Sequence, residues 1–215
     1  MIYRDRTEAA ERLADALSAW KGEKPLVVAI PRGGVPIGRI VAQKLDGDLD
    51  IVLTRKLPAP GNPELAVGAI DETGWEYLSE YARDAGASDA YVAHVAAAEL
   101  DTIRRRRALY TPRRAPLPAD GRVVIVVDDG LATGATMIAA LHAMRARHPK
   151  RIVCAVPVAS AEALDKVRAY ADEVVCLQVP EYFYAVGQFY RSFPQVDDDA
   201  VVALLRAEDD GDGRG

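Results

Sequence analysis

Two adjacent carboxylates, Asp128 and Asp129, stand directly after the aliphatic run Val123 to Val127. A short run of this kind predicts a strand buried on both faces of a parallel sheet. Ligands of such sheets bind beyond the carboxyl ends of the strands, where both acids would lie. Carboxylates there can accept hydrogen bonds from sugar hydroxyls or coordinate a divalent cation. The alternative is that they only cap the following helix.

The residues after the acids predict a small, hydroxyl-rich turn at the start of a helix. They are Gly130, Leu131, Ala132, Thr133, Gly134, Ala135 and Thr136. Small side chains let an anion approach the backbone, and N–H groups at a helix start attract phosphate. Because the acids would repel a naked phosphate, we expect them to face another part of the same ligand. A phosphorylated sugar accompanied by Mg²⁺ satisfies both halves of the motif.

Two further loops carry groups suited to an anion. The first follows the predicted strand Leu26–Ile30 and consists of Pro31, Arg32, Gly33 and Gly34. Its glycines permit backbone conformations closed to other residues, and its amides could face an anion. The second is Arg55-Lys56, which ends the second predicted strand at its carboxyl side, and whose charges would stabilise a leaving group that gains negative charge. The alternatives are a plain strand-to-helix turn for the first loop and a solvated pair for the second.

The elements that would position these groups alternate along the chain. Six apolar runs predict strands: Leu26–Ile30, Asp50–Thr54, Leu65–Ile70, Val123–Val127, Ile152–Val156 and Glu173–Leu177. Helical patterns follow Asp5 and cover Val35–Leu45, Tyr91–Leu109, Gly134–Arg147 and Ala161–Tyr170. This alternation predicts an α/β fold, a parallel sheet flanked by helices. The 215 residues suit a single domain, 1–215, with its core at about 26–178.

Three segments fall outside the strand-helix rhythm. Residues 71–121 are too long for a simple crossover, so they form a lid containing a helix or decorate a sheet edge. Residues 180–207 begin with an aromatic stretch and predict a small C-terminal cap. The acidic, glycine-rich tail 208–215 is predicted to fray.

Composition narrows the function classes. The formal net charge of -5 argues against a large nucleic-acid-binding face. No run approaches the roughly 18 apolar residues that a membrane span needs, and the first residues lack the apolar core of a secretory signal. Cys154 and Cys176 sit in apolar runs, which favours reduced thiols over a disulfide. The three histidines, with His142 and His148 expected at the surface, show no metal-ligand spacing. We expect a cytoplasmic protein without membrane or nucleic-acid partners.

Val123 to Thr136 resembles the phosphoribosyl-diphosphate (PRPP) signature of the type I phosphoribosyltransferases: four aliphatic residues, two acids, two mostly aliphatic residues and a Thr/Gly-rich turn. Gly130 departs from it, since that position is usually aliphatic. Strand order and three loops extend the resemblance from about Leu26 to Leu177. The stretch Tyr182–Tyr190 is similar to a group of predicted bacterial phosphoribosyltransferases whose acceptor is unassigned.

The resemblance implies transfer of ribose 5-phosphate from PRPP to a nucleobase-like acceptor, with release of pyrophosphate and with Mg²⁺ as cofactor. It implies that Asp128 and Asp129 hold the ribose hydroxyls and the metal, and that the backbone of Ala132 to Thr136 holds the 5-phosphate. It also implies that the Pro31–Gly34 loop grips the pyrophosphate. Arg55 and Lys56 occupy positions where the family often has basic residues.

The acceptor and the lid are left open by the sequence. Hypoxanthine-type members have an aspartate where this chain has Ala132, which argues against that substrate class. The aromatic residues of Tyr182–Phe193 could clamp a flat base or form the core of the cap. The run Arg104–Arg107, followed by Arg113 and Arg114, is either a solvated helix end or the source of one arginine over the pyrophosphate.

Two other functions compete with the transferase. One is a PRPP-binding regulator or sensor without turnover. The other is a phosphate-binding α/β enzyme such as a phosphatase, which would need a nucleophile in the turn. Assembly into a homo-oligomer is compatible with each of them.

Overall fold

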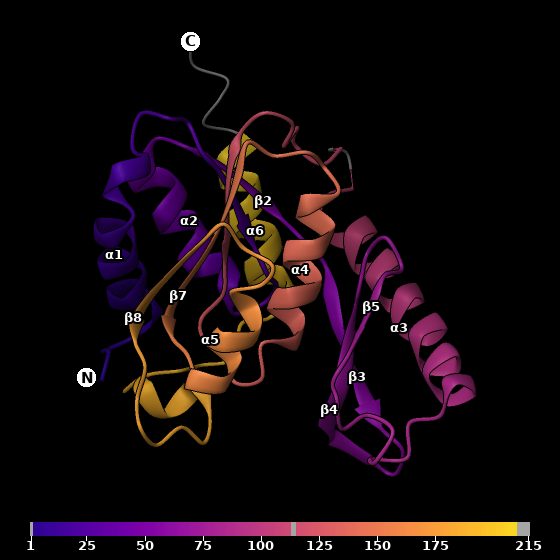
Figure 1. Cartoon of the computed structure of the whole chain (residues 1–215). Helices are drawn as coiled ribbons and strands as arrows, with labels where there is room; N and C mark the ends of the chain where they lie inside the picture. The colour runs from indigo at the N-terminus through magenta and orange to yellow at the C-terminus, as the bar shows by residue number, and fades with distance from the viewer. Residues whose placement is uncertain (1, 113–114, 210–215) are drawn as a thin grey trace.

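A five-stranded parallel sheet forms the centre of the computed structural model, which describes residues 2–112 and 115–209 (Figure 1). The strands are β1 (Leu26–Ala29), β2 (Asp48–Ile51), β6 (Val123–Val127), β7 (Arg151–Val158) and β8 (Glu173–Gln178). Their order is β2-β1-β6-β7-β8, and each neighbouring pair is parallel. The predicted parallel sheet is confirmed. Because β1 and β6 are direct neighbours with Ala29 opposite Val127, the loops that follow them open side by side.

Helices cover both faces of this sheet (Figure 1). One face carries α1 (Arg6–Ala16), α2 (Gly34–Leu45) and α6 (Asp198–Asp209), and the other carries α4 (Ala135–Arg145) and α5 (Ala161–Val167). Alternate strand residues belong to two hydrophobic cores, one on each face. Val27 and Ile125 pack in the core with α1, α2 and α6, and Val28 and Val126 pack in the core with α4 and α5. Burial on both faces explains why the strands read as unbroken aliphatic runs.

The prediction that all six strands share one sheet is wrong. The strands β3 (Thr54–Ala59), β4 (Asn62–Asp71) and β5 (Glu76–Leu78) form a separate antiparallel sheet. The predicted strand Asp50–Thr54 is also divided, since β2 ends at Ile51 and β3 begins at Thr54. Arg55 and Lys56 therefore lie inside the antiparallel strand β3, contrary to the prediction that they end a strand of the parallel sheet. Gly61, with φ of 70°, supplies the left-handed residue in the tight reversal between β3 and β4. A reversal this short joins antiparallel strands only.

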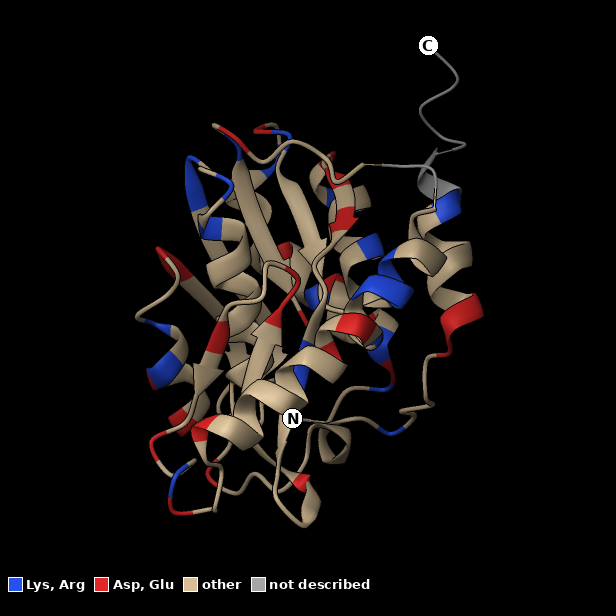
Figure 2. Cartoon of the chain, turned by 90° about the vertical axis from the view of Figure 1, so that its right-hand side faces the viewer, with Lys and Arg blue, Asp and Glu red and all other residues tan. Residues whose placement is uncertain are grey.

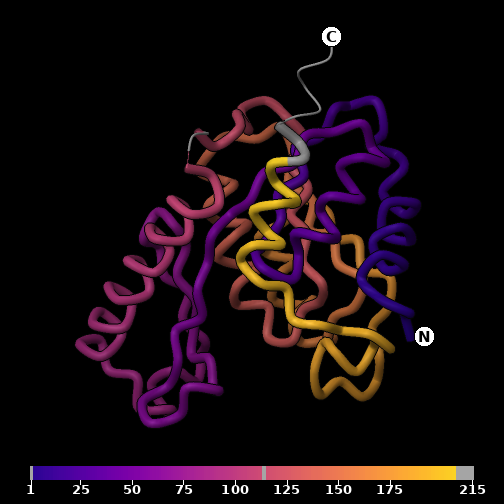
Figure 3. The backbone as a smooth tube through the Cα atoms, turned by 180° about the vertical axis from the view of Figure 1, so that it is seen from behind, coloured from indigo at the N-terminus to yellow at the C-terminus, as the bar shows by residue number. Residues whose placement is uncertain are grey.

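Residues 54–110, which we call the arm, stand beside α4 and project from the main body (Figures 1 and 3). The arm contains β3, β4, β5 and the long helix α3 (Asp89–Tyr110), so most of the segment expected as a lid shares one unit with β3 and β4. Asp71 joins the arm to α4, because its Oδ2 lies 3.1 Å from Nδ1 of His142. The His142 ring also stacks on Trp75 at 3.8 Å between centroids. His142 therefore lies in an interface, contrary to the surface position that we expected.

The C-terminal segment returns across the start of the chain (Figure 3). Tyr3 donates a backbone hydrogen bond to Phe189 and accepts one from Arg191. Five rings pack together around the 3₁₀ turn η2 (Val186–Phe189): Tyr3, Phe183, Phe189, Tyr190 and Phe193. Beyond them α6, which the sequence did not predict, continues through Asp209. Residues 210–215 of the predicted frayed tail lie outside the described residues.

Cys154 and Cys176 are both free thiols. Within residues 2–112 and 115–209, no helix combines the length and the apolar character needed to cross a membrane. Basic and acidic residues are interspersed over the side shown in Figure 2.

Candidate functional site

The loop after β1 packs directly against the two acids after β6. A Cβ atom added to Gly33 would lie 2.0 Å from Oδ2 of Asp129. One added to Gly34 would lie 2.8 Å from the carbonyl oxygen of Val127. Only glycine leaves room for these approaches. The structure thus brings together the glycine loop and the acidic pair, as the sequence predicted; the peptide bond between Pro31 and Arg32 is cis.

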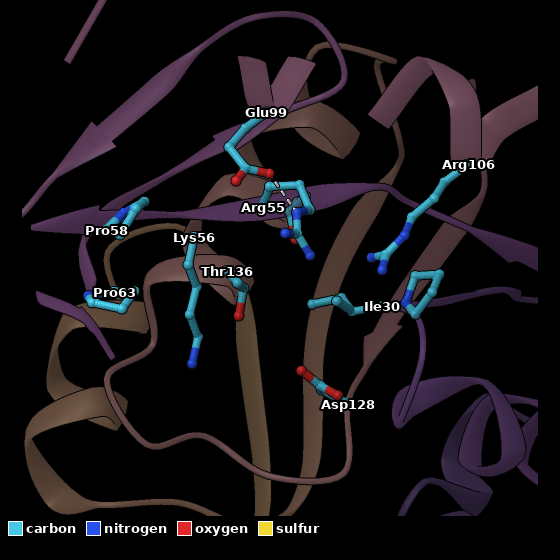
Figure 4. Close-up of a pocket in the computed structure, with 11 residues that line it drawn as sticks. Ile30, Arg55, Lys56, Pro58, Pro63, Glu99, Arg106, Asp128 and Thr136 are labelled. Atoms are coloured by element: carbon cyan, nitrogen blue, oxygen red, sulfur yellow. Dashed lines mark hydrogen bonds and ion pairs between the residues drawn. The ribbon is translucent and has the colours of Figure 1, made fainter. Parts of the chain in front are cut away.

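A cavity of about 490 Å³ opens in front of this junction (Figure 4). Its lining residues come from the ends of β1 and β6, from the arm and from the start of α4: Ile30, Pro31, Thr54, Arg55, Lys56, Pro58, Pro63, Glu99, Arg106, Asp128 and Thr136. The carboxylate of Asp128 lies on one side of this cavity, and basic side chains of the arm lie on the other (Figure 4). An opening with an acid facing a basic wall suits a ligand that carries both hydroxyls and phosphates.

The basic wall has three members with different surroundings. The Nε of Arg55 donates to Oε2 of Glu99 at 2.6 Å, so part of its charge is already balanced. Lys56 is exposed and extends into the open part of the cavity (Figure 4). Arg106 reaches the cavity from α3. The arm therefore supplies a cation fixed by Glu99, an exposed cation and a third cation from the arginine run.

The side chains of Arg104–Arg107 point to different sides of α3, as consecutive positions of a helix must. Arg104 pairs with Asp101 on the exposed side of α3. Arg107 donates to Oε2 of Glu72 at 2.6 Å and to the carbonyl oxygen of Ile51 at 3.2 Å, which ties α3 to β2. Figure 2 shows this basic turn of α3 near α6. Arg106 alone among Arg104–Arg107 lines the cavity, while Arg113 and Arg114 lie outside the described residues.

The turn after the acids keeps backbone amides near the cavity. Ile138 donates to the carbonyl oxygen of Gly134, so the amides of Ala135 and Thr136 precede the hydrogen-bond ladder of α4. Gly134 takes a left-handed φ of 80°. Thr136 lines the cavity, whereas Thr133 is exposed at the tip of the turn. This arrangement can receive a phosphate at the helix start.

Asp128 is held in an electrostatically costly position. Burial raises the pKa of Asp128 well above the usual carboxyl value, and the neighbouring charge of Asp129 raises it further. The backbone amide of Asp129, which donates to Oδ1 of Asp128 at 2.8 Å, opposes this rise, as do Lys56 and Arg6. Strongly perturbed carboxylates of this kind are common at functional sites.

Asp129 turns away from the cavity that Asp128 faces. Its Oδ2 accepts from Nε of Arg6 at 3.0 Å and from Nη2 of Arg6 at 2.8 Å. Arg6 also donates to the carbonyl oxygen of Pro194 at 2.7 Å and lies 3.8 Å from the centroid of the Phe193 ring. Tyr190 donates its hydroxyl to the carbonyl oxygen of Asp129 at 2.7 Å. We call Arg6, Tyr190, Phe193 and Pro194 the terminal clamp.

Burial raises the pKa of Asp129 as well, and the charge of Arg6 partly offsets that rise. The same burial, with the charge of Asp129, raises the pKa of the Tyr190 hydroxyl. A second cavity of about 310 Å³ lies on this side, lined by Arg6, Arg32, Gly33, Asp129, Phe193, Pro194, Gln195 and Val196. Sequence reasoning missed Arg6, because no local pattern links it to a carboxylate 123 positions away.

Comparison with known proteins identifies the family. A model of the phosphoribosyl transferase domain matches residues 3–193. This chain belongs to the phosphoribosyltransferase family. Two Mycobacterium tuberculosis proteins, from strains CDC 1551 / Oshkosh and H37Rv, carry names that place them among phosphoribosyl transferases. Each is 40% identical over 212 residues, covering 95% of this chain and 46% of its own. The chain thus spans about half the length of these curated relatives.

Solved structures agree on the fold. A crystal structure from Thermus thermophilus is 45% identical, with a TM-score of 0.81 over 97% of this chain and 99% of that one. A Neisseria gonorrhoeae hypothetical protein, solved with bound ppGpp, is 14% identical with a TM-score of 0.50, over 96% of this chain and 98% of that one, which shows the fold alone. The family match and this structure thus agree on a phosphoribosyl transferase domain built on a parallel sheet flanked by helices.

The structure explains the departure of this phosphoribosyltransferase from the family motif at Gly130. A Cβ atom at this position would lie 2.7 Å from Cγ1 of Val186 and 3.0 Å from Cγ1 of Val158. The C-terminal segment therefore occupies the space in which an aliphatic side chain would lie. Val186 fills the space of the missing side chain, and its contact with Gly130 joins the motif to the aromatic cap.

The carboxylate at the cavity fits a metal that is also bound by phosphate oxygens of a ligand. In the described part of the chain, no group of three or more His, Cys, Asp or Glu residues could hold a metal ion. Mg²⁺ is commonly bound through one or two carboxylates together with phosphate oxygens and water. Asp128, which faces the cavity, would be the protein ligand in that arrangement, whereas the predicted second ligand, Asp129, faces the second cavity and accepts from Arg6.

Proposed function

We propose that this phosphoribosyltransferase moves ribose 5-phosphate from PRPP to a nucleobase-like acceptor and releases pyrophosphate. The observation that carries the proposal is the facing of Asp128 and the cations Lys56 and Arg106 across one cavity. A sugar diphosphate presents hydroxyls to an acid and phosphates to cations, so it matches both walls. A cytoplasmic role in nucleotide salvage would follow from such a reaction.

In this proposal the ribose hydroxyls lie on Asp128 and Asp129, and the 5-phosphate lies on the turn from Gly130 to Thr136. The diphosphate lies between Arg32, Gly33 and Gly34 on one side and Arg55 and Lys56 on the other. Because Arg6 already donates twice to Oδ2 of Asp129, a sugar hydroxyl has to share that carboxylate with Arg6. Asp128 would therefore carry the larger part of sugar recognition.

The reaction makes a bond from the acceptor nucleophile to C1 of the ribose while the bond from C1 to the diphosphate oxygen breaks. The electron pair leaves with pyrophosphate, and the proton of the acceptor leaves to solvent or a base. Arg55, Lys56 and Arg106 stabilise the negative charge that grows on the leaving group. Mg²⁺, when bound, neutralises further charge on the diphosphate. The chain thus acts by positioning and by charge stabilisation, without a covalent nucleophile.

We propose the second cavity as the place of the acceptor. It shares Asp129, Arg32 and Gly33 with the diphosphate and ribose regions and is lined by Phe193. One face of the Phe193 ring is covered by Arg6. Phe193 also packs against Tyr190, at 4.8 Å between ring centroids, within the cluster of cap rings, while Tyr182 and Tyr184 are exposed. Among the described rings Phe193 lines this cavity, so we propose that a flat base bound there contacts it.

Pyrophosphate release tests the transferase. The chain is incubated with PRPP, Mg²⁺ and a panel of purine and pyrimidine bases, and release is expected with one class of base. Binding of PRPP without release across the whole panel would favour the regulator or sensor. The pairing of Arg55 with Glu99 and of Asp129 with Arg6 is the observation that favours that second candidate, because both groups are already engaged. Absence of PRPP binding would contradict both functions.

A further inference from the structure

The hydroxyl of Thr54 is buried at the cavity without a protein partner. The residue is 8% exposed, and its Oγ1 has no hydrogen-bond partner among the described residues. Thr54 lines the 490 Å³ cavity beside Arg55 and Lys56. Buried hydroxyls are nearly always hydrogen-bonded, so an unpaired one at a ligand cavity points to a ligand atom.

The nearest acid across the strand pair does not account for this hydroxyl. Thr54 stands opposite Asp71 in the β3–β4 ladder. Asp71 is engaged by other residues: its Oδ1 accepts from the amide and the hydroxyl of Thr73 and from the amide of Trp75. Its Oδ2 contacts His142. Asp71 is therefore held by Thr73, Trp75 and His142, and its carboxylate makes no hydrogen bond with the Thr54 hydroxyl.

We propose that Thr54 binds the diphosphate: its hydroxyl donates a hydrogen bond to a phosphate oxygen held between Lys56 and Arg106. A hydroxyl can donate or accept, and the cations around it select an acceptor-rich, anionic ligand. Arg55 donates to Glu99, so part of its charge is already balanced. A neutral donor on the same wall can then add to the binding of a phosphate oxygen. The inference rests on the proposed function and adds a residue that the family motif does not contain.

The position of Thr54 gives this contact a structural basis. It is the first residue of β3, directly after the chain leaves the parallel sheet for the arm. Ligand binding to Thr54 would therefore connect the arm to the carboxyl end of β6, where Asp128 lies. An apolar valine of the same shape would fill the position equally well in a protein without a ligand here.

The test compares Thr54→Val with Thr54→Ser. Binding of Mg²⁺–PRPP, Mg²⁺–pyrophosphate and inorganic phosphate is measured by calorimetry, and thermal unfolding is measured without ligand. Thr54→Val is expected to unfold at the wild-type temperature or above, because it removes an unpaired polar group. It should weaken PRPP and pyrophosphate binding by about tenfold, as expected for loss of a hydrogen bond to a charged group. Thr54→Ser should bind both within about threefold of wild type.

Each contrary result identifies a different failure. Equal affinities of wild type and Thr54→Val for PRPP would overturn the Thr54 assignment and leave the transferase proposal standing. A loss for PRPP without a loss for pyrophosphate would also overturn it, since the hydroxyl would then touch another part of PRPP. A lower unfolding temperature of Thr54→Val would show a structural role instead. If wild type binds inorganic phosphate but neither PRPP nor pyrophosphate, the proposed function and the Thr54 inference fall together.

Discussion

Asp128 and Asp129 are adjacent in the sequence but belong to two different regions of the molecule. Asp128 lines the cavity between the sheet and the arm. Asp129 is held by the terminal clamp and lines the second cavity. The first region therefore keeps an acid that faces a ligand cavity, whereas the second encloses an acid in a salt bridge whose partners are 10% and 13% exposed.

The difference shows how one motif can serve binding and architecture together. A buried charge that lacks a close cation costs stability, and that cost is tolerated where a ligand will use the charge. A buried charge with a fixed guanidinium instead joins distant parts of the chain. On this interpretation Asp128 is mainly a ligand-binding group, and Asp129 also fixes the N-terminal and C-terminal segments to the sheet edge.

Removing the guanidinium of Arg6 is expected to have the largest effect on stability. Arg6→Ala leaves the Asp129 carboxylate buried without its cation and should lower the free energy of unfolding by about 3 kcal/mol. Arg4→Ala is the control, because Arg4 pairs with Asp5 at an exposed position and should show no measurable change. Urea denaturation measures both.

The double variant Arg6→Ala/Asp129→Asn sharpens this test. Once the carboxylate is also neutral, no unpaired charge is left, so part of the lost stability should return. Strictly additive losses would show that the two side chains do not depend on each other, and the clamp would lose its role.

Neutralising Asp128 should have the opposite signature. Asp128→Asn is expected to weaken Mg²⁺–PRPP binding about 100-fold, which corresponds to about 2.7 kcal/mol. It should also raise the unfolding temperature at neutral pH, because a partly buried charge whose pKa is raised disappears. Calorimetry and thermal unfolding measure the two effects, with the exposed Asp165→Asn as control. A destabilised Asp128→Asn with unchanged affinity would reverse the comparison between the two acids.

The pH dependence of stability tests the same asymmetry. Burial raises the folded-state pKa of Asp128 above its unfolded value, so the protonated folded form is relatively favoured. This contribution is fully present below the unfolded carboxyl pKa and is lost as pH rises through the raised pKa. The stability advantage of Asp128→Asn over wild type should therefore grow above pH 4, by about 1.4 kcal/mol for every pH unit that separates the unfolded-state pKa from the folded-state pKa. A difference independent of pH, measured by denaturation at several pH values, would contradict the burial argument.

The central parallel sheet could be predicted because the residue types of each strand show directly that the strand is buried. Val123 to Val127 is buried on both faces, and so its aliphatic character appears in every residue. In β4, by contrast, Asn62 to Leu65 is exposed and Ala66 to Asp71 is buried. The apolar half alone resembled a short strand of the main sheet, so the sequence suggested the wrong partner for it.

The site was predictable in its loops and unpredictable in its long-range pairs. Gly33 and the acids follow strands that the sequence placed in one parallel sheet, and the structure brings them into contact. Arg6 and Thr54 could not be found from the sequence in this way. Arg6 is important because of a distant carboxylate, that of Asp129, and Thr54 because its hydroxyl has no hydrogen-bond partner among the described residues. The residues of a motif indicate the carboxyl ends of the strands. Which cavity each of its two acids faces depends on the tertiary packing.

The smallest predicted effect concerns the contact between Gly130 and the C-terminal segment. Gly130→Ala would place a methyl group 2.7 Å from Val186, so this close contact should lower the free energy of unfolding by about 1 kcal/mol. Val186→Ala alone opens a gap next to Gly130 and should also destabilise. The double variant Gly130→Ala/Val186→Ala restores the volume with a different division, so its loss should be smaller than the sum of the two single losses. Denaturation of the four proteins measures this coupling. If the losses add, Val186 is not what excludes a side chain at Gly130, and the link between the motif and the cap must lie in the clamp at Asp129 alone.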